Sequence, residues 1–215
     1  MNGKKVPEGT IIRLFTIVRE LNELKDVGIH TVSSAELGER TNSNDAQVRK
    51  DLAYFGQFGK SGAGYKIDEL KQALEKILGK NKIWNVVIVG IGHMGLALLS
   101  YPGFEKHGLN IVSAVDANKR KINKKINDIT IKSFEDLHKE IASKKISIGI
   151  IAVPAKHAQE VAIRLVCAGI KCILNFAPCK LTVPFEVKVK NVDLSRELET
   201  LSYYLVNPVR GRKKN

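Results

Sequence analysis

Three glycines with the spacing GxGxxG carry the clearest chemical signature in the sequence. They directly follow a short β-branched run, residues 85–89. Between a strand and a helix, such glycines permit a tight turn, let the backbone approach a pyrophosphate and allow the helix to pack closely on the strand. Unpaired N–H groups and the macrodipole at the helix start favour bound phosphate. The predicted nucleotide-binding residues of this loop are Gly90, Ile91, Gly92, His93, Met94 and Gly95.

One carboxylate stands where a dinucleotide site needs it. Asp116 ends the second β-branched run, about 20 residues after the last glycine of the loop. A carboxylate there accepts hydrogen bonds from the adenosine ribose and disfavours a 2′-phosphate, which predicts NAD(H) rather than NADP(H). The cations of residues 119–121 point the other way, because they could hold a 2′-phosphate.

Two later loops are expected to close over the cofactor, because ligands bind at the carboxyl ends of parallel strands. The predicted residues in these loops are Val153, Pro154, Asn175, Phe176 and Ala177. Cys179 lies beside the second loop, where it is expected to be a small buried residue, with a thiol sensor as the alternative.

The sequence lacks the remaining parts of an enzyme. A dehydrogenase also needs a proton donor and a substrate pocket, yet only one helix and a tail are expected after the last strand. The five histidines form no HExxH or other metal spacing, and there is no GxSxG. A binding protein without catalysis or metal is therefore expected. A dehydrogenase with an unusual N-terminal cap and a CoA or other adenylate-binding module stay open as alternatives.

The elements that must position this site alternate along the second half of the chain. Short β-branched or apolar runs are separated by helical stretches, notably residues 155–168, and the runs occupy residues 85–89, 111–115, 146–153 and 172–175. Such alternation predicts right-handed βαβ units and a parallel sheet. An α/β Rossmann domain is expected over residues 81–193, after a boundary near residues 79–82.

Residues 1–80 are predicted to form a winged helix-turn-helix domain. Thr10 is the expected N-cap of a first helix to residue 25, and Ser34 opens a short second helix over 35–40. A turn at 42–44 leads to a third helix, and a further amphipathic helix is expected over 68–78. The glycine-rich segment 56–65 suits a tight β-hairpin, or wing. A three-helix protein-interaction module is the alternative.

The third helix, residues 45–55, is the expected reader of double-stranded DNA. In a helix-turn-helix the second helix enters the major groove by its N-terminal residues, and the wing reaches an adjacent groove or phosphate. The predicted DNA-binding residues are Ser34, Asn44, Gln47, Arg49, Lys50, Tyr54, Lys60, Ser61 and Gly62.

Composition bounds these interpretations. The formal net charge of +13 suggests a polyanionic partner, but residues 1–80 hold 13 basic and 11 acidic residues, so the excess lies elsewhere and could serve solubility alone. Three cysteines without CxxC spacing indicate a reducing compartment rather than a disulfide framework. Without a signal peptide or a membrane-spanning apolar run, a cytoplasmic protein is expected.

The last segment, residues 194–215, predicts a helix that packs on another surface, followed by a basic tail. Leu194, Leu198, Leu201 and Leu205 lie at spacings of four, three and four, which gives one apolar helix face.

Taken together, these motifs resemble the redox-sensing transcriptional repressor family Rex. The resemblance spans about residues 6–208, and the segments that carry it are residues 47–56, 58–59, 62–65, 89–95, 101–104, 169–171, 173–178, 191–194 and 201–205. It implies a homodimer that binds palindromic operators and releases them when NADH rises, with the last helix swapped into the partner subunit. Two departures, Asn118 for a second carboxylate and Asn123 for a glycine, concern affinity and NADH/NAD⁺ selectivity rather than the fold.

The resemblance leads to a two-state hypothesis. Arg49, Lys50 and Lys60 hold the operator in an open state, and NADH closes the Rossmann domains and changes the separation of the recognition helices. A tight apolar pocket near Phe176 would prefer the uncharged ring of NADH. A pair between Arg19 and Asp193, formed between subunits, is the expected coupling of head to ligand domain.

Overall fold

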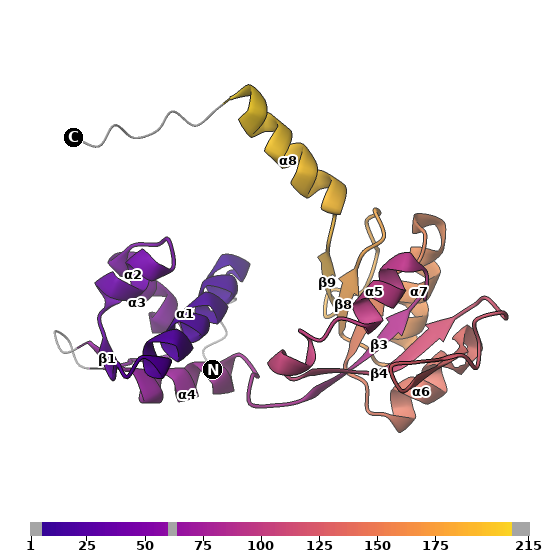
Figure 1. Ribbon diagram of the computed structural model, residues 1–215, viewed down its shortest axis with the longest axis horizontal. Coiled ribbons are helices and arrows are strands. Elements are labelled where there is room, and N and C mark those ends of the chain that lie inside the picture. Colours follow the sequence, from indigo (N-terminus) through magenta and orange to yellow (C-terminus); the bar gives the residue numbers. More distant parts are fainter. Residues whose placement is uncertain (1–5, 60–63, 208–215) are drawn as a thin grey trace. The chain divides into compact units, whose positions relative to one another are not determined.

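The computed structural model describes residues 6–59 and 64–207. It divides into two units, residues 1–82 and 83–215, and each is described by itself (Figure 1).

Four helices build the first unit: α1 (Glu8–Asp26), α2 (Ser34–Arg40), α3 (Asp45–Ala53) and α4 (Ile67–Ile77). The helical spacing of the apolar residues in α1 buries Leu14, Val18, Leu21 and Leu24 on one side. They meet Leu37 and other apolar side chains of α2–α4 in one core cluster. The three-helix arrangement expected of a helix-turn-helix is therefore present, with α2 and α3 as its two helices.

The helix ends differ in detail from the expected ones. Thr10 is not the N-cap of α1, because the helix already begins at Glu8 after Pro7, and Thr10 is buried in its first turn. Ser33 rather than Ser34 caps α2, since its hydroxyl accepts a hydrogen bond from the Glu36 N–H at 3.1 Å. α3 ends at Ala53, two residues earlier than expected.

The predicted tight hairpin over residues 56–65 is wrong for the part that the structure describes. Residues 56–59 contain no strand, and β2 (Tyr65–Lys66) pairs antiparallel with β1 (Thr31–Val32), which precedes α2. Gly64 makes this pairing feasible: its φ is +71°, and a Cβ there would lie 2.9 Å from the Val32 carbonyl oxygen. Lys60, Ser61 and Gly62 lie outside the described residues.

The second unit is built on a seven-stranded sheet in the order β5-β6-β4-β3-β7-β8-β9. The four expected strands are present and parallel, as β3 (Trp84–Val89), β4 (Leu109–Asp116), β7 (Ile148–Ile151) and β8 (Cys172–Asn175). Two parallel strands were not predicted, β6 (Ile129–Ser133) and β9 (Lys188–Asn191), and β5 (Lys125–Ile126) pairs antiparallel at the edge.

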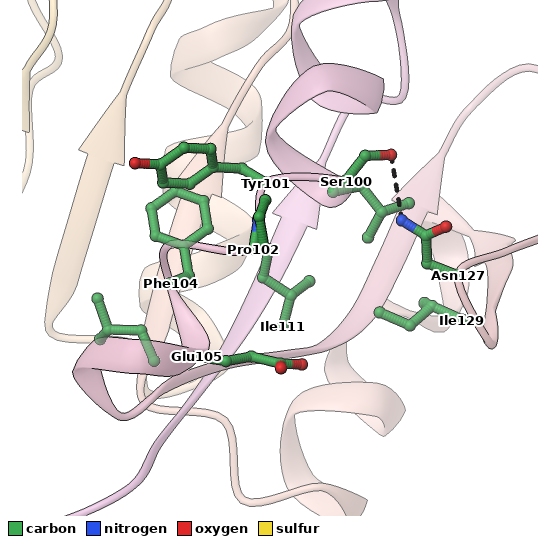
Figure 2. A pocket seen from close by; sticks show the side chains of 10 residues that line it. Ser100, Tyr101, Pro102, Phe104, Glu105, Ile111, Asn127 and Ile129 are labelled. Atoms are coloured by element: carbon green, nitrogen blue, oxygen red, sulfur yellow. Dashed lines mark hydrogen bonds between the residues drawn. The ribbon is translucent and has the colours of Figure 1, made fainter.

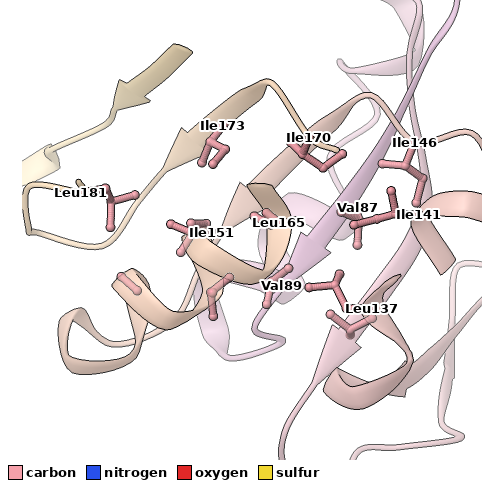
Figure 3. Close-up of a cluster of buried hydrophobic side chains, with 14 of the residues drawn as sticks. Val87, Val89, Leu137, Ile141, Ile146, Ile151, Leu165, Ile170, Ile173 and Leu181 are labelled. Atoms are coloured by element: carbon pink, nitrogen blue, oxygen red, sulfur yellow. The ribbon is translucent and has the colours of Figure 1, made fainter. Parts of the chain in front are cut away.

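Helices cover both faces of this sheet, as a doubly wound fold requires. Successive β3 side chains point to opposite faces, so Val87 and Val89 join one core cluster while Val86 and Ile88 join another. α6 (Leu137–Ser143) and α7 (Ala155–Cys167) pack on the first face, where Leu165 lies near Ile151 (Figure 3). α5 (His93–Leu99) packs on the second face through Leu99.

The last helix, α8 (Leu194–Val206), contributes no buried residue to the described chain. Asp193 caps it by accepting a hydrogen bond from the Arg196 N–H at 3.2 Å. The leucine stripe is largely exposed, with 68% of Leu198 and 58% of Leu201 accessible. Within the described residues, no helix is long and apolar enough to span a bilayer.

Candidate nucleotide and DNA sites

The three glycines of the GxGxxG loop have three different surroundings. Gly90 adopts φ +94°, and a Cβ there would collide with Val153 and the Ala152 carbonyl. A Cβ on Gly95 would overlap the Gly90 carbonyl oxygen, so this glycine lets α5 approach the loop. A Cβ on Gly92 would have no described atom within 4 Å, so the backbone there faces open space. This is the distribution of roles that a pyrophosphate-binding turn requires.

α5 begins at His93, inside the GxGxxG motif, with Gly92 as the N-cap. His93 and Met94 therefore belong to the first helical turn rather than to the loop, and both are exposed. The N–H groups at this helix start have no helical acceptors, so the helix begins where a phosphate would be bound.

Asp116 at the end of β4 holds the glycine loop in place. Its Oδ2 accepts a hydrogen bond from the Ile91 N–H at 2.8 Å, and its Oδ1 accepts one from the Asn118 N–H at 2.7 Å. The Lys121 ammonium lies 3.1 Å from Oδ2. Burial acts to raise the pKa of Asp116, but these donors lower the pKa overall, so the carboxylate is ionised at neutral pH. The residue predicted to bind ribose therefore also fixes the backbone that would bind phosphate.

A cleft of about 590 Å³ opens beside this loop. It brings together the predicted residues Gly90, Gly92, Asp116, Val153 and Pro154. Its remaining lining residues were not in the predicted set, although Asn118 and Lys121 were noted for their bearing on nucleotide choice. They are Val89, Ala117, Asn118, Lys121, Phe134, Glu135, Ala152, His157, Glu160 and Val161. Four of the lining residues come from the end of β4 or the loop after it, so the predicted ribose-binding position and the glycine loop lie on one cavity.

Phe134 lines this cleft, and Arg164 of α7 lies over its ring. The guanidinium carbon of Arg164 lies 4.5 Å from the ring centroid, and an Nη1 of Arg164 also bonds Glu135 at 2.9 Å. Sequence reasoning missed Phe134 because it missed β6, the strand that delivers it.

The structure does not bring the predicted loop 175–177 into this cleft. Asn175 is fully buried, and its amide donates to the carbonyls of Ala177 and Cys179 and to Oδ1 of Asn191. Asn175 thus ties the loop to β9.

The other predicted residues of this loop lie elsewhere. Ala177 lines a different hollow of about 330 Å³, together with Asp193 and other residues. Phe176 packs partly buried against the α5 side of the sheet. Cys179 is half-buried.

A further hollow of about 270 Å³ lies beside α5, and none of its lining residues lines the glycine-loop cleft. The rings of Tyr101 and Phe104 meet edge to face there, with centroids 5.1 Å apart, and Asn127 donates to the Ser100 hydroxyl at 3.1 Å (Figure 2). Residues 101–104, one of the segments that resemble the Rex family, therefore line a hollow separate from the glycine-loop cleft.

The head unit gathers several of the predicted DNA-binding side chains around α3. Arg49 bonds the Ser34 hydroxyl at 3.0 Å and pairs with Asp45 at 2.7 Å. The Oδ1 of Asn44 caps α3 by accepting from the Gln47 N–H at 2.7 Å. Lys50 is exposed, and 36% of Tyr54 is accessible. This face presents cations and amides, the groups that read phosphates and base edges.

Sequence reasoning missed a buried network behind the same helix. Asp51 is 1% exposed, and its carboxylate binds side chains of Thr10, Arg13 and Gln47. The pattern of apolar residues could not show it, because a single aspartate in a helix more often faces solvent. The two residues predicted to couple the domains are both exposed: Arg19 lies on α1, and Asp193 precedes α8.

A helix-turn-helix unit and a nucleotide-binding Rossmann unit on one chain define the class of ligand-responsive DNA-binding proteins. Two known families match parts of the chain: a putative DNA-binding protein N-terminus over residues 5–53 and a CoA binding domain over residues 81–179.

Whole-chain similarities are more specific. A redox-sensing transcriptional repressor Rex of Carboxydothermus hydrogenoformans is 49% identical over 94% of this chain and 98% of its own length. Its counterpart in Pelotomaculum thermopropionicum is 48% identical over 96% of this chain and 97% of its own. The protein RSP, solved with NAD⁺ and operator DNA, has 42% identity and a TM-score of 0.89, covering 95% of this chain and 94% of its own. The chain belongs to the Rex family of redox-sensing transcriptional repressors.

Proposed function

We propose that this protein represses transcription by binding operator DNA as a homodimer, and that NADH releases it. The observation that carries the proposal is the full-length match to RSP, which has been solved with NAD⁺ and operator DNA and also with NADH. The chain has the two functional surfaces that such a protein needs. They are a helix-turn-helix unit with α3 as reader and a cleft beside an open glycine loop.

For the nucleotide, the fit rests on Gly92 and Asp116. The open space at Gly92 admits a pyrophosphate, and the ionised Asp116 retains acceptor capacity for ribose hydroxyls. Lys121 neutralises part of that carboxylate charge at 3.1 Å, so it tunes the choice between a ribose hydroxyl and a 2′-phosphate. When bound, the dinucleotide supplies no chemistry here. It acts as a ligand whose two redox forms differ in affinity.

We assign DNA binding, NAD(H) binding and subunit contact to three consecutive segments of the chain. Residues 1–80 read DNA, residues 81–193 bind NAD(H), and residues 194–215 hold the exposed stripe of α8 that a second subunit would cover. A protein that reads chromosomal operators acts in the cytoplasm. Two copies of α3 would then contact half-sites of a palindrome about one helical turn apart.

The direct test is fluorescence anisotropy of a labelled palindromic operator at fixed salt, because phosphate contacts make affinity salt-dependent. We expect tight binding without nucleotide, release by NADH and little effect of NAD⁺. CoA is titrated in parallel, since one matched family is described as a CoA binding domain. A tight complex that no NADH concentration releases contradicts redox sensing, and release by CoA alone identifies a different ligand.

Coupling between the head and the ligand domain is proposed to use a pair between Arg19 of one subunit and Asp193 of the other. Because Asp193 also caps α8, the informative change is Asp193→Asn, which keeps a good capping side chain and removes the charge. We expect NADH to lose most of its effect on operator affinity, while NADH binding itself is retained.

Asp128→Asn is the matched control, because it removes another exposed carboxylate. Asp128 Oδ1 lies 2.7 Å from Lys125 Nζ. If Asp193→Asn keeps the full NADH effect measured by anisotropy, the pair does not carry the coupling.

A further inference from the structure

The network around Asp51 offers more than stability to the recognition helix. We infer that Asp51 is a positioning residue that fixes the side-chain amide of Gln47 in the orientation that reads an adenine. This inference rests on the proposed DNA-binding function, because it assumes that α3 enters the major groove.

The contact between Gln47 and Asp51 is direct and partly buried. Gln47 lies one helical turn before Asp51 on α3, and its Nε2 donates to Asp51 Oδ1 at 2.9 Å. Asp51 is 1% exposed, whereas Gln47 is half-buried and lies near the start of the helix, the part expected to meet base edges.

Asp51 cannot turn away from Gln47, because α1 holds it from the other side. Arg13 binds Oδ2 through Nε and Oδ1 through Nη2, the latter at 2.8 Å, in a two-pronged ion pair. The Thr10 hydroxyl donates to Oδ1 at 2.8 Å. Burial acts to raise the pKa of Asp51, but these donors lower the pKa overall, so the group remains an ionised acceptor.

An ionised carboxylate accepts hydrogen bonds and donates none, so only the nitrogen end of the Gln47 amide can face it. One amide proton is thereby committed to Asp51. The other amide proton and Oε1 have no partner among the described residues, so they remain for a ligand. A donor and an acceptor side by side are the pair that matches N7 and N6 of adenine in the major groove.

The consequence is specificity at one position of each half-site. A glutamine that rotates freely presents its donor and acceptor in either order and must lose that freedom on binding. A glutamine held by Asp51 presents only the order that suits adenine. We therefore expect an A·T preference of about 5- to 100-fold over other pairs at one position per half-site.

The test compares binding-site selection from randomised duplexes at fixed salt for the wild type and three variants. Gln47→Met keeps the side-chain length and removes the amide, so it should erase the preference at one position per half-site. Asp51→Asn should weaken the preference at that same position and leave the other positions unchanged. Asp68→Asn is the matched control, because it removes an exposed carboxylate that Lys25 binds at 2.6 Å, and it should select as the wild type does.

The outcomes distinguish a failure of operator binding from a failure of Gln47 positioning. If the wild type selects no sequence, the proposed operator binding fails before the positioning of Gln47 is in question. If the wild type selects a sequence and Gln47→Met changes nothing, Gln47 reads no base and the inference is overturned. It is also overturned if Gln47→Met relaxes one position while folded Asp51→Asn leaves that position fully selective.

A second measurement covers the case in which Asp51→Asn does not fold. Amide proton exchange of the Gln47 side chain is followed by NMR in the free, isotope-labelled wild type. We expect two resolved amide protons, one of them exchanging more slowly than in an exposed glutamine such as Gln57. Two protons that exchange as fast as those of Gln57 would overturn the inference without any variant.

Discussion

Replacing Leu198 and Leu201 together by glutamate should convert the proposed homodimer to a monomer and abolish tight operator binding. Both leucines lie on the exposed stripe of α8, which has no buried residue in the described chain. Each leucine covered by a partner contributes about 1.5–3 kcal/mol, and a symmetric dimer covers each twice. The loss is therefore at least about 6 kcal/mol, or about 10,000-fold in the dimer dissociation constant.

Light scattering after size exclusion gives the mass, and operator anisotropy gives the affinity. Thr200→Glu is the control, because it adds one glutamate on a different face of α8, where the Thr200 hydroxyl donates to the Arg196 carbonyl. It should remain dimeric and bind operator as the wild type does. A double variant that stays dimeric would mean that α8 is not the subunit interface.

The periodicity of apolar residues was sufficient for the main elements of both units. α1 and the strands β3, β4, β7 and β8 were predictable because each buries a continuous apolar stripe or run. β6 and β9 were missed because each is a run of only five or four residues, although both alternate polar and apolar side chains as half-buried strands do. Their strand character comes from pairing with β4 and β8 at the two sides of the sheet.

The site residues that could be predicted from the sequence are those that directly follow a recognisable strand. The glycine loop and Asp116 follow strands that could be located, so their places at the sheet edge followed from topology. Lys121, Phe134 and His157 also line the cleft, but they reach it from a loop, a 3₁₀ turn and the α7 helix, whose directions no local pattern encodes. Lys121 had one available signal, its position in a basic run close after Asp116.

Helix ends and polar partners were less predictable for a physical reason. Two adjacent serines stand at the start of α2, and either could cap it, so the choice of Ser33 depends on the incoming path set by β1. Likewise, the sequence around Thr10 suggested a cap, because the residue that its hydroxyl bonds, Asp51, lies 41 residues away and cannot be inferred locally. Contacts of this separation depend on the packing of α1 against α3, which is a tertiary property.

Replacing Gly92 by valine should remove the NADH response while leaving the fold and operator binding intact. The backbone at Gly92 has φ −80°, which any L-residue tolerates, and a Cβ there would meet no described atom within 4 Å. The added side chain would occupy the open space where the pyrophosphate must approach the backbone. We expect a loss of NADH affinity of about 100-fold or more, equivalent to about 2.7 kcal/mol, measured by calorimetric titration.

The neighbouring glycines make this variant diagnostic. A side chain at Gly90 or Gly95 would collide with the protein itself, so loss of NADH binding there would also follow from a distorted loop. At Gly92 the melting temperature should stay at the wild-type value, and the operator should remain bound at NADH concentrations that release the wild type. Ala97→Val places the same branched group on an exposed position of α5 outside the cleft lining and should leave NADH binding unchanged. If Gly92→Val binds NADH normally, the dinucleotide does not lie over this loop, and the cleft beside Asp116 is not its site.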